Sequence, residues 1–180
     1  MPSILVVTGS VRPNSVNAKV VPLVVDEFKA QGADVVVADL GELNLPFSDA
    51  PQAPTSPDFE PTHESVKQWT QLVADANGVL FVTPEYNHML TPVQLNAIDW
   101  VGKEWNEKPI SFVGYGWTSG AGQAQAAATE AFTTLFKAKV GEKPTNLFFT
   151  KHISPEGDVI EATEVATAIA ATAAELLSNS

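Results

Sequence analysis

Residues 3–15 read SILVVTGSVRPNS, and their pattern indicates the class of fold. Its first half is an apolar, β-branched run, which is typical of a buried strand. Its second half contains a glycine, two serines, an asparagine and an arginine, which together favour a turn into a helix N-terminus. The stretch therefore predicts a strand, a polar loop and a helix in succession, the repeating unit of parallel α/β proteins.

Four more apolar runs repeat the pattern along the chain. They are nearly continuous in hydrophobicity rather than alternating, as expected of strands that are buried on both faces. The five predicted strands cover residues 4–8, 33–40, 78–83, 109–115 and 146–150. Strands that alternate with helices predict a parallel sheet covered by helices on both faces.

The predicted helices carry apolar residues at four-residue spacing, which marks the buried face of a helix. These residues are Val20, Val24 and Phe28; Trp69 and Val73; and Ala124, Ala128, Phe132 and Phe136. The alanine-rich segment 161–177 predicts a final helix. Pro22 falls inside the first helical pattern and removes a backbone donor, so that helix is predicted either to kink or to begin its regular part late.

Length and composition narrow the function. A chain of 180 residues suits one domain, residues 1–180. The net charge of −11 argues against a nucleic-acid partner or an anionic membrane surface. The absence of cysteine excludes disulfides and thiolate chemistry. No apolar stretch approaches the length of a membrane span and the first residues do not resemble a signal peptide, so we expect a cytoplasmic protein without a membrane partner.

Parallel sheets bind ligands beyond the carboxyl ends of their strands, so the loops there carry the functional information. In the first, Gly9 permits a sharp turn, Ser10, Ser15 and Asn17 offer donors, and Arg12 adds a positive charge. Together with helix N-terminal amides this set favours a phosphate. The alternative is a serine cap beside a surface arginine. The spacing matches neither the P-loop nor the dinucleotide-binding motif.

The second loop begins where Pro84 ends the third strand and continues through residues 85–88 with the sequence EYNH. Polar and aromatic groups directly beyond a buried strand suit a flat heteroaromatic ligand. We interpret His88 as a surface or polar-contact residue rather than a general base, because the sequence shows no partner for a triad or a metal site.

The third loop, residues 114–125, contains four glycines that permit close approach of the backbone to a ligand. The alternative is a flexible strand-to-helix turn capped by Ser119.

Each of the three loops alone is weak evidence for a ligand site. Because all three lie at one edge of the predicted sheet, they predict a mononucleotide site with a phosphate cradle and two loops for a planar ring.

Several motifs then carry a resemblance to a known family: GSVRPNS (9–15), LPF (45–47), TPEYNH (83–88), NAIDW (96–100), EWNEKPISFVGYG (104–116) and SGAG (119–122). With them the chain resembles the NADPH-dependent FMN reductase family over nearly its whole length. The resemblance implies a flavodoxin-like, three-layer α/β sandwich. Its five-stranded parallel sheet would have the strand order 2-1-3-4-5.

The resemblance also implies FMN as cofactor and assigns its contacts by position. Ser10, Arg12, Ser15 and Asn17 would hold the FMN phosphate, with Val16 also in contact; Pro84, Glu85, Tyr86 and Asn87 would line the isoalloxazine ring; and Trp117, Thr118, Ser119 and Gly120 would flank its other edge. Amides of the third loop would stabilise negative charge near flavin N1 and O2.

The implied activity passes hydride from NADPH or NADH to flavin N5. Electrons then pass to a quinone, another flavin, an azo compound or a metal oxyanion. No side chain need be catalytic and no metal is implied. The resemblance also implies a homodimer or homotetramer. The helices that bear Trp100 and Trp105 would be interface elements, or the two tryptophans would be buried in the core.

Four features depart from the family pattern: the run Met89–Leu90–Thr91, and Leu95, Trp117 and Gln123. Trp117 would either stack on the flavin or fill the site of its ring. The family commonly has a lysine where Leu95 stands and an arginine where Gln123 stands. The absence of these two cations weakens the case for binding the extra phosphate of NADPH. The proline-rich segment 41–62 is either a stiff surface connection or a flap or dimer contact beside the site.

Two alternatives to an oxidoreductase stay open. One is a non-enzymatic electron carrier of the flavodoxin type, against which Arg12 and the TPEYN motif argue. The other is a relative that has lost flavin and acts through protein contacts, which the four departures favour. A response-regulator receiver shares the fold class but needs an acidic pair after the first strand, where this chain has none.

Overall fold

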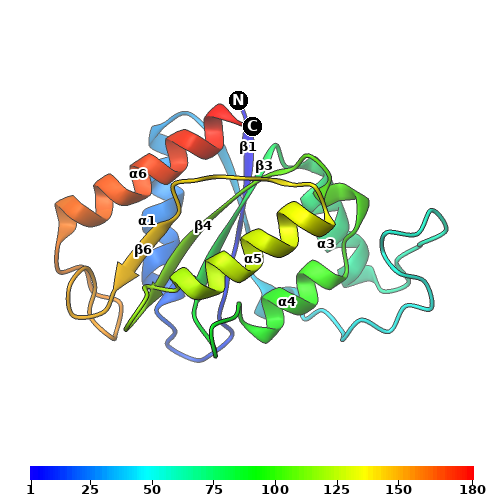
Figure 1. Cartoon of the computed structure of the whole chain (residues 1–180), viewed down its shortest axis with the longest axis horizontal. Coiled ribbons are helices and arrows are strands. Elements are labelled where there is room, and N and C mark those ends of the chain that lie inside the picture. Colours follow the sequence, from blue (N-terminus) through cyan, green and yellow to red (C-terminus); the bar gives the residue numbers. More distant parts are fainter.

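A computed structural model describes all 180 residues and contains one parallel sheet (Figure 1). The strands are β1 Ser3–Val7, β2 Asp34–Ala38, β3 Gly78–Pro84, β4 Pro109–Gly116, β5 Lys139–Val140 and β6 Thr145–Phe148. Their order is β2-β1-β3-β4-β5, with β6 also paired to β4, and every pairing is parallel. The predicted sheet and its strand order are therefore confirmed.

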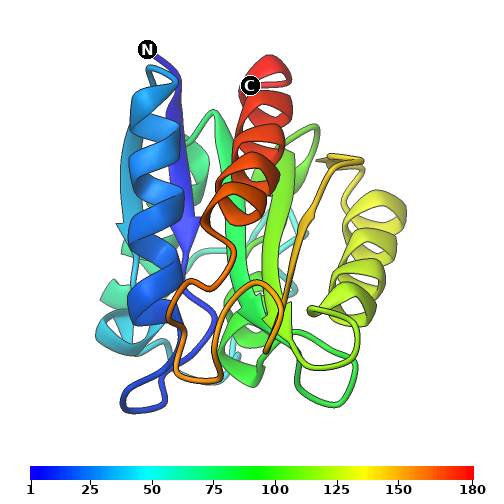
Figure 2. The same cartoon turned by 90° about the vertical axis from the view of Figure 1, so that its left-hand side faces the viewer.

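Helices cover both faces of the sheet. They are α1 Asn17–Ala30, α2 Leu40–Leu43, α3 Glu64–Asp75, α4 Pro92–Asp99, the 3₁₀ turn η1 Lys103–Trp105, α5 Gly122–Leu135 and α6 Ala162–Ser178. Figure 2 shows α1 and α6 side by side on one face of the sheet, and α5 lies on the other face. None of these helices is both long and apolar enough to cross a lipid bilayer.

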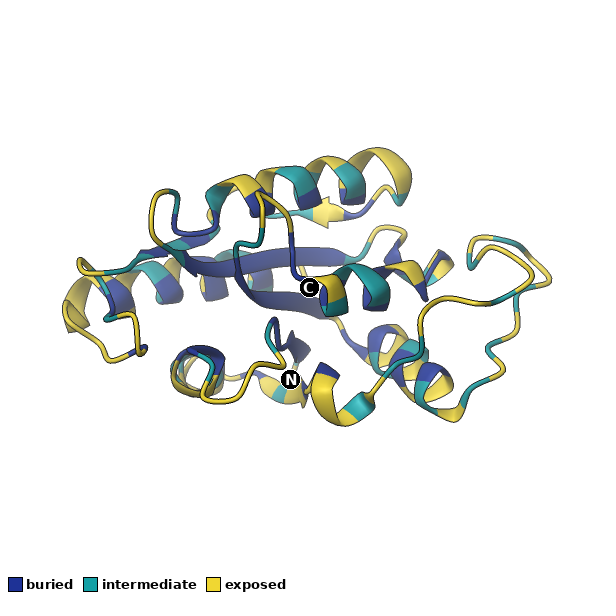
Figure 3. Cartoon of the chain, turned by 90° about the horizontal axis from the view of Figure 1, so that it is seen from below, coloured by how far each residue is buried: buried dark blue, intermediate teal, exposed yellow.

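Alternation along the central strands creates two separate hydrophobic cores. Leu5 and Val7 of β1 join the core beneath α3, α4 and α5, whereas Ile4 and Val6 join the core beneath α1 and α6. This follows from the two-residue period of a strand, which sends neighbouring side chains to opposite faces. Figure 3 shows the central strands buried between helices whose outer faces are exposed. The three-layer architecture is thus confirmed.

The predicted helix faces are buried as expected, including Val20, Val24 and Phe28 of α1, but Phe136 is half-buried and lies just beyond the end of α5. Helix α1 begins at Asn17 and continues through Pro22, so a late start of its regular part is wrong. Pro22 lies on the exposed side of the helix, where water can bond the carbonyl that lacks its helical donor.

Two strands differ from expectation. The predicted strand 146–150 is one of two short pieces on the same edge of β4: β5 pairs with Pro109 and Ile110, and β6 pairs with Val113 to Gly116. The pieces are separated by residues 141–144, where Pro144 has no N–H to donate to the ladder. Strand β2 is at the sheet edge, so Val36 and Val37 are 42% and 44% exposed rather than buried.

Trp100 and Trp105 both have fully buried side chains within this chain. The indole N–H of Trp100 donates to the Pro46 carbonyl (2.7 Å), and that of Trp105 donates to the Ile98 carbonyl (3.3 Å). The two tryptophans are therefore core residues, and the role of the helices that bear them in an interface stays a prediction.

Candidate functional site

A cavity of about 470 Å³ opens at the carboxyl ends of β1, β3 and β4. It is lined by Ser10, Arg12, Pro13, Asn14, Ser15, Val16, Pro84, Glu85, Tyr86, Tyr115, Gly116, Trp117, Thr118, Ser119, Phe149 and Pro155. The three loops that the sequence singled out therefore meet around one space. Phe149 and Pro155 add a fourth segment, after β6, that sequence reasoning missed.

The first loop presents a set of donors without protein partners. The backbone N–H groups of Asn14, Ser15 and Val16 donate to no acceptor in the chain. Asn14 adopts a left-handed conformation with φ of 56°, which turns the loop into α1. Arg12 is the only arginine of the protein and takes part in no ion pair. Unbonded amides around a free guanidinium form a site for an anion.

Asn17 lies beneath this loop and is not among the residues that line the cavity. Its amide nitrogen donates to Tyr115 Oη (2.6 Å), and its amide oxygen accepts from the backbone N–H groups of Gly9 (2.6 Å) and Ser10 (3.1 Å). Burial raises the pKa of the Tyr115 phenol, and the neighbouring Tyr86 raises it further, so this hydroxyl stays protonated. Asn17 therefore fixes the base of the loop together with Tyr115, which also lines the cavity.

Glu85 joins the second loop to the third. One oxygen of its carboxylate accepts from Ser119 Oγ (2.9 Å) and from the backbone N–H groups of Gln123 (3.0 Å) and Ala124 (3.1 Å). Its other oxygen lies 3.4 Å from Nδ1 of His88, whose side chain is otherwise exposed. His88 is thus a polar-contact residue, as the sequence suggested.

These contacts set the ionisation of Glu85. Burial raises its pKa, but the hydrogen bonds from Ala124, Ser119, Gln123 and His88 together bring the pKa below its ordinary value. The carboxylate is consequently ionised at neutral pH. Because the folded-state pKa is lowered, its contribution to stability is complete above the unfolded-state pKa and is lost as the pH falls through the folded-state value.

The third loop supplies a second set of open donors. The backbone N–H groups of Thr118, Ser119 and Gly120 donate to no acceptor in the chain. Trp117 is 61% exposed and packs edge-to-face against Phe149, with ring centroids 5.2 Å apart. The indole thus forms a side wall of the cavity and does not fill it. Gly120 and Asn87, both expected near the ring, are not among the lining residues.

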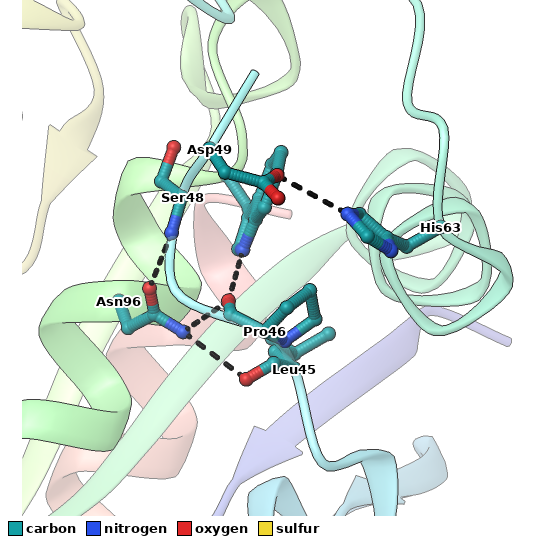
Figure 4. A network of polar contacts seen from close by, with 7 residues as sticks. Leu45, Pro46, Ser48, Asp49, His63 and Asn96 are labelled. Atoms are coloured by element: carbon teal, nitrogen blue, oxygen red, sulfur yellow. Dashed lines mark hydrogen bonds and ion pairs between the residues drawn. The ribbon is translucent and has the colours of Figure 1, made fainter.

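The proline-rich segment is held at its first end by α4 (Figure 4). Asn96 Nδ2 donates to the carbonyls of Pro46 (2.9 Å) and Leu45 (3.5 Å), and Asn96 Oδ1 accepts from the Ser48 N–H (3.2 Å). His63 Nε2 lies 3.1 Å from a carboxylate oxygen of Asp49, which ties the two ends of the segment together. Between these ties Phe47 projects outward and is 85% exposed.

Replacing Asn96 with alanine should lower the free energy of unfolding by about 1–2 kcal/mol, because its hydrogen bonds to residues 45, 46 and 48 are lost and the Pro46 carbonyl keeps only its bond from Trp100. Urea denaturation measures this. Asn106→Ala removes an exposed amide and is the matched control. Equal stability of the two variants would show that Asn96 does not secure the segment.

The residues present fit FMN. A cavity of about 470 Å³ is within the ordinary range for small-molecule sites. Its polar end combines Arg12 with the unbonded amides of residues 14–16, which suits a phosphate monoester. Its other end combines aromatic walls with the unbonded amides of residues 118–120, which suits a flat ring that carries oxygens and nitrogens.

Comparison with known proteins also points to an FMN-binding family. The family model "NADPH-dependent FMN reductase" matches residues 2–149. An NAD(P)H-dependent FMN reductase from Nectria sp. is 34% identical over 150 residues, covering 78% of this chain and 72% of the relative. A 2-hydroxy-1,4-benzoquinone reductase from Burkholderia sp. is 33% identical over 116 residues, covering 62% and 58%. The fold matches FerB, a flavoenzyme NAD(P)H:(acceptor) oxidoreductase from Paracoccus denitrificans, with a TM-score of 0.76, 21% identity and 99% coverage of both chains.

Proposed function

The chain belongs to the NADPH-dependent FMN reductase family, and from that membership we propose that it is an FMN-dependent NAD(P)H oxidoreductase that reduces a small-molecule acceptor. The observation that carries the proposal is the pairing, in one cavity, of Arg12 and free amides at one end with aromatic walls at the other.

Each part of the cavity has a role in this proposal. Arg12, the amides of residues 14–16 and the hydroxyls of Ser10 and Ser15 hold the phosphate of FMN, and Val16 contacts the cofactor. Asn17 acts from beneath, by fixing the backbone of Gly9 and Ser10.

The ring is held by the other two loops. Pro84, Glu85 and Tyr86 of the second loop and Trp117, Thr118 and Ser119 of the third loop line the cavity and would hold the ring between them. Asn87 and Gly120 shape these loops through their left-handed backbones, with φ of 52° and 57°. The open amides of residues 118–120 can donate to a ring that gains negative charge during reduction.

When bound in this cavity, FMN would supply the redox chemistry between NADPH or NADH and the acceptor. The protein orients the ring and supplies donors. We propose a quinone as acceptor, because the exposed Trp117 and the half-buried Phe149 at the cavity wall offer aromatic surface for a planar ring and a relative is named for a benzoquinone. Other flavins, azo compounds and metal oxyanions are the competing acceptors.

Titration of the purified protein with FMN, followed by addition of NADH and NADPH in separate samples, tests the proposal. Saturable binding and rapid loss of flavin absorbance with either donor is the expected result, followed by reoxidation on adding a benzoquinone. Binding without reduction by either donor would indicate an electron carrier instead. Absence of binding at tens of micromolar FMN would indicate a relative that acts without flavin.

Trp117→Gly is predicted to weaken FMN binding by about 0.5–1.5 kcal/mol, because the indole forms a wall and leaves the cavity open. Quenching of flavin fluorescence gives the dissociation constant. Val159→Ala is the control, because Val159 is an exposed apolar residue outside the cavity lining. Tighter binding in Trp117→Gly would mean that the indole obstructs the ring.

We propose further that the protein assembles as a homodimer or homotetramer. We expect Phe47 to lie at the interface, because it is a large aromatic side chain that is 85% exposed on a segment held in place by Asn96. Analytical ultracentrifugation of the wild type and of Phe47→Ser tests the proposal. A monomeric wild type at micromolar concentration would contradict it.

A further inference from the structure

We infer that Glu85 is a positioning residue that locks the two ring loops together and, through its negative charge, lowers the affinity of the site for reduced flavin. The inference rests on the proposed function, since it concerns FMN in the same cavity. It assigns to Glu85 a role through other groups rather than through direct contact with the cofactor.

The contacts of Glu85 are the first support. The carboxylate comes from the loop after β3, and its donors are Ser119, Gln123 and Ala124, which follow β4. Its side chain is only 12% exposed. Three hydrogen bonds to one oxygen of a nearly buried carboxylate form a strong, charge-assisted link between segments that are 34 or more residues apart.

The start of α5 gives the second support. Its N-cap residue is Ala121, in a left-handed conformation with φ of 71° and without a capping side chain. The first turn of a helix leaves amide N–H groups unpaired and concentrates positive partial charge. Glu85 supplies the missing acceptor from another part of the chain, so the helix start and the second loop are fixed by one interaction.

The charged side chains around the cavity affect how strongly the site would bind reduced FMN relative to oxidised FMN. Arg12 and Glu85 are the only charged side chains that line it. Arg12 lies in the phosphate loop, whereas Glu85 lies between the two ring loops. Around Glu85, the groups that face it are His88, Ser119 and the amides of α5. A fixed negative charge beside the ring opposes the additional charge of a reduced flavin. Neutralising Glu85 should therefore favour reduced over oxidised FMN.

Two substitutions separate the two roles. Glu85→Gln keeps an oxygen that can accept from Gln123 and Ala124 but removes the charge. Glu85→Ala removes both. Glu130→Gln, an exposed carboxylate further along α5, is the matched control. The readouts are the dissociation constants of oxidised FMN and of dithionite-reduced FMN, measured anaerobically by fluorescence and calorimetry, together with thermal melting of each variant.

In Glu85→Gln, oxidised FMN should bind within about threefold of the wild type, while the preference for reduced FMN rises about tenfold. In Glu85→Ala, oxidised FMN should bind about tenfold more weakly, because the loops lose their link. Glu130→Gln should change neither constant. If Glu85→Ala fails to fold, Glu85→Gln alone still decides the charge effect.

An unchanged preference for reduced FMN in Glu85→Gln would overturn the electrostatic role. Wild-type affinity for oxidised FMN in a folded Glu85→Ala would overturn the positioning role. Failure of the proposed function is distinguishable from both, because it would appear as absence of FMN binding to the wild type itself.

Discussion

Arg12→Ala is expected to weaken FMN binding by about 1.5–3 kcal/mol, which corresponds to roughly 10- to 150-fold in the dissociation constant. The guanidinium is the only positive charge that lines the cavity, and no carboxylate in the chain pairs with it. A phosphate that loses this donor keeps the backbone amides of residues 14–16 but loses its charge-assisted bond.

Fluorescence titration at two ionic strengths measures the effect. The wild type should lose affinity as salt rises, and the variant should lose less, because salt screens an interaction that the variant no longer makes. Lys19→Ala is the control, since Lys19 is on the adjacent first turn of α1 but pairs with Asp158 outside the cavity lining. Equal affinity of Arg12→Ala and the wild type would remove Arg12 from the site.

Gly9→Ala is expected to lower the free energy of unfolding by about 3 kcal/mol or more and to abolish high-affinity FMN binding. A Cβ atom at this position would lie 2.3 Å from the Val82 carbonyl oxygen and 2.8 Å from Thr83 Cα. Both atoms belong to the backbone of the central strand β3, which cannot yield without disturbing both of its neighbours.

Denaturant unfolding followed by circular dichroism gives the stability, and fluorescence titration gives the affinity. Gly32→Ala provides the comparison. Gly32 has φ of 86° and would place its Cβ in open space, so its cost of about 1 kcal/mol comes from the backbone conformation alone. If Gly9→Ala were no less stable than Gly32→Ala, the first loop would not depend on close contact with β3.

The order of strands and helices was predictable from the sequence because the signals are local. An apolar run such as residues 78–83 can only be a buried segment, and the four-residue spacing of Val20, Val24 and Phe28 can only face a core if the segment is helical. The division of the last strand into β5 and β6 was not predictable in the same way. It depends on how residues 141–144 pass the edge of β4, which is a tertiary contact.

The candidate site was likewise predictable only where the signals in the sequence are local. Three loops were placed at one edge by the topology of parallel sheets, and the structure brings them around one cavity. The direction in which each side chain points could not be predicted from the sequence. Asn17 and Glu85 are polar residues in binding loops, yet the Asn17 amide is bonded to Tyr115 and the Glu85 carboxylate to residues 119–124, which lie far away in sequence. Phe149 and Pro155 carried no motif, so nothing in the sequence marked the segment after β6 as part of the site.

The cavity is assembled from segments near residues 10–16, 84–86, 115–119 and 149–155, which span most of the chain. A ligand that needs all four is bound by the folded chain and not by the unfolded one, so its binding free energy adds to stability. At a ligand concentration of 100 times the dissociation constant this addition is about 2.7 kcal/mol. Resistance to proteolysis, and therefore the lifetime of the protein in a cell, would then rise and fall with the supply of the nucleotide.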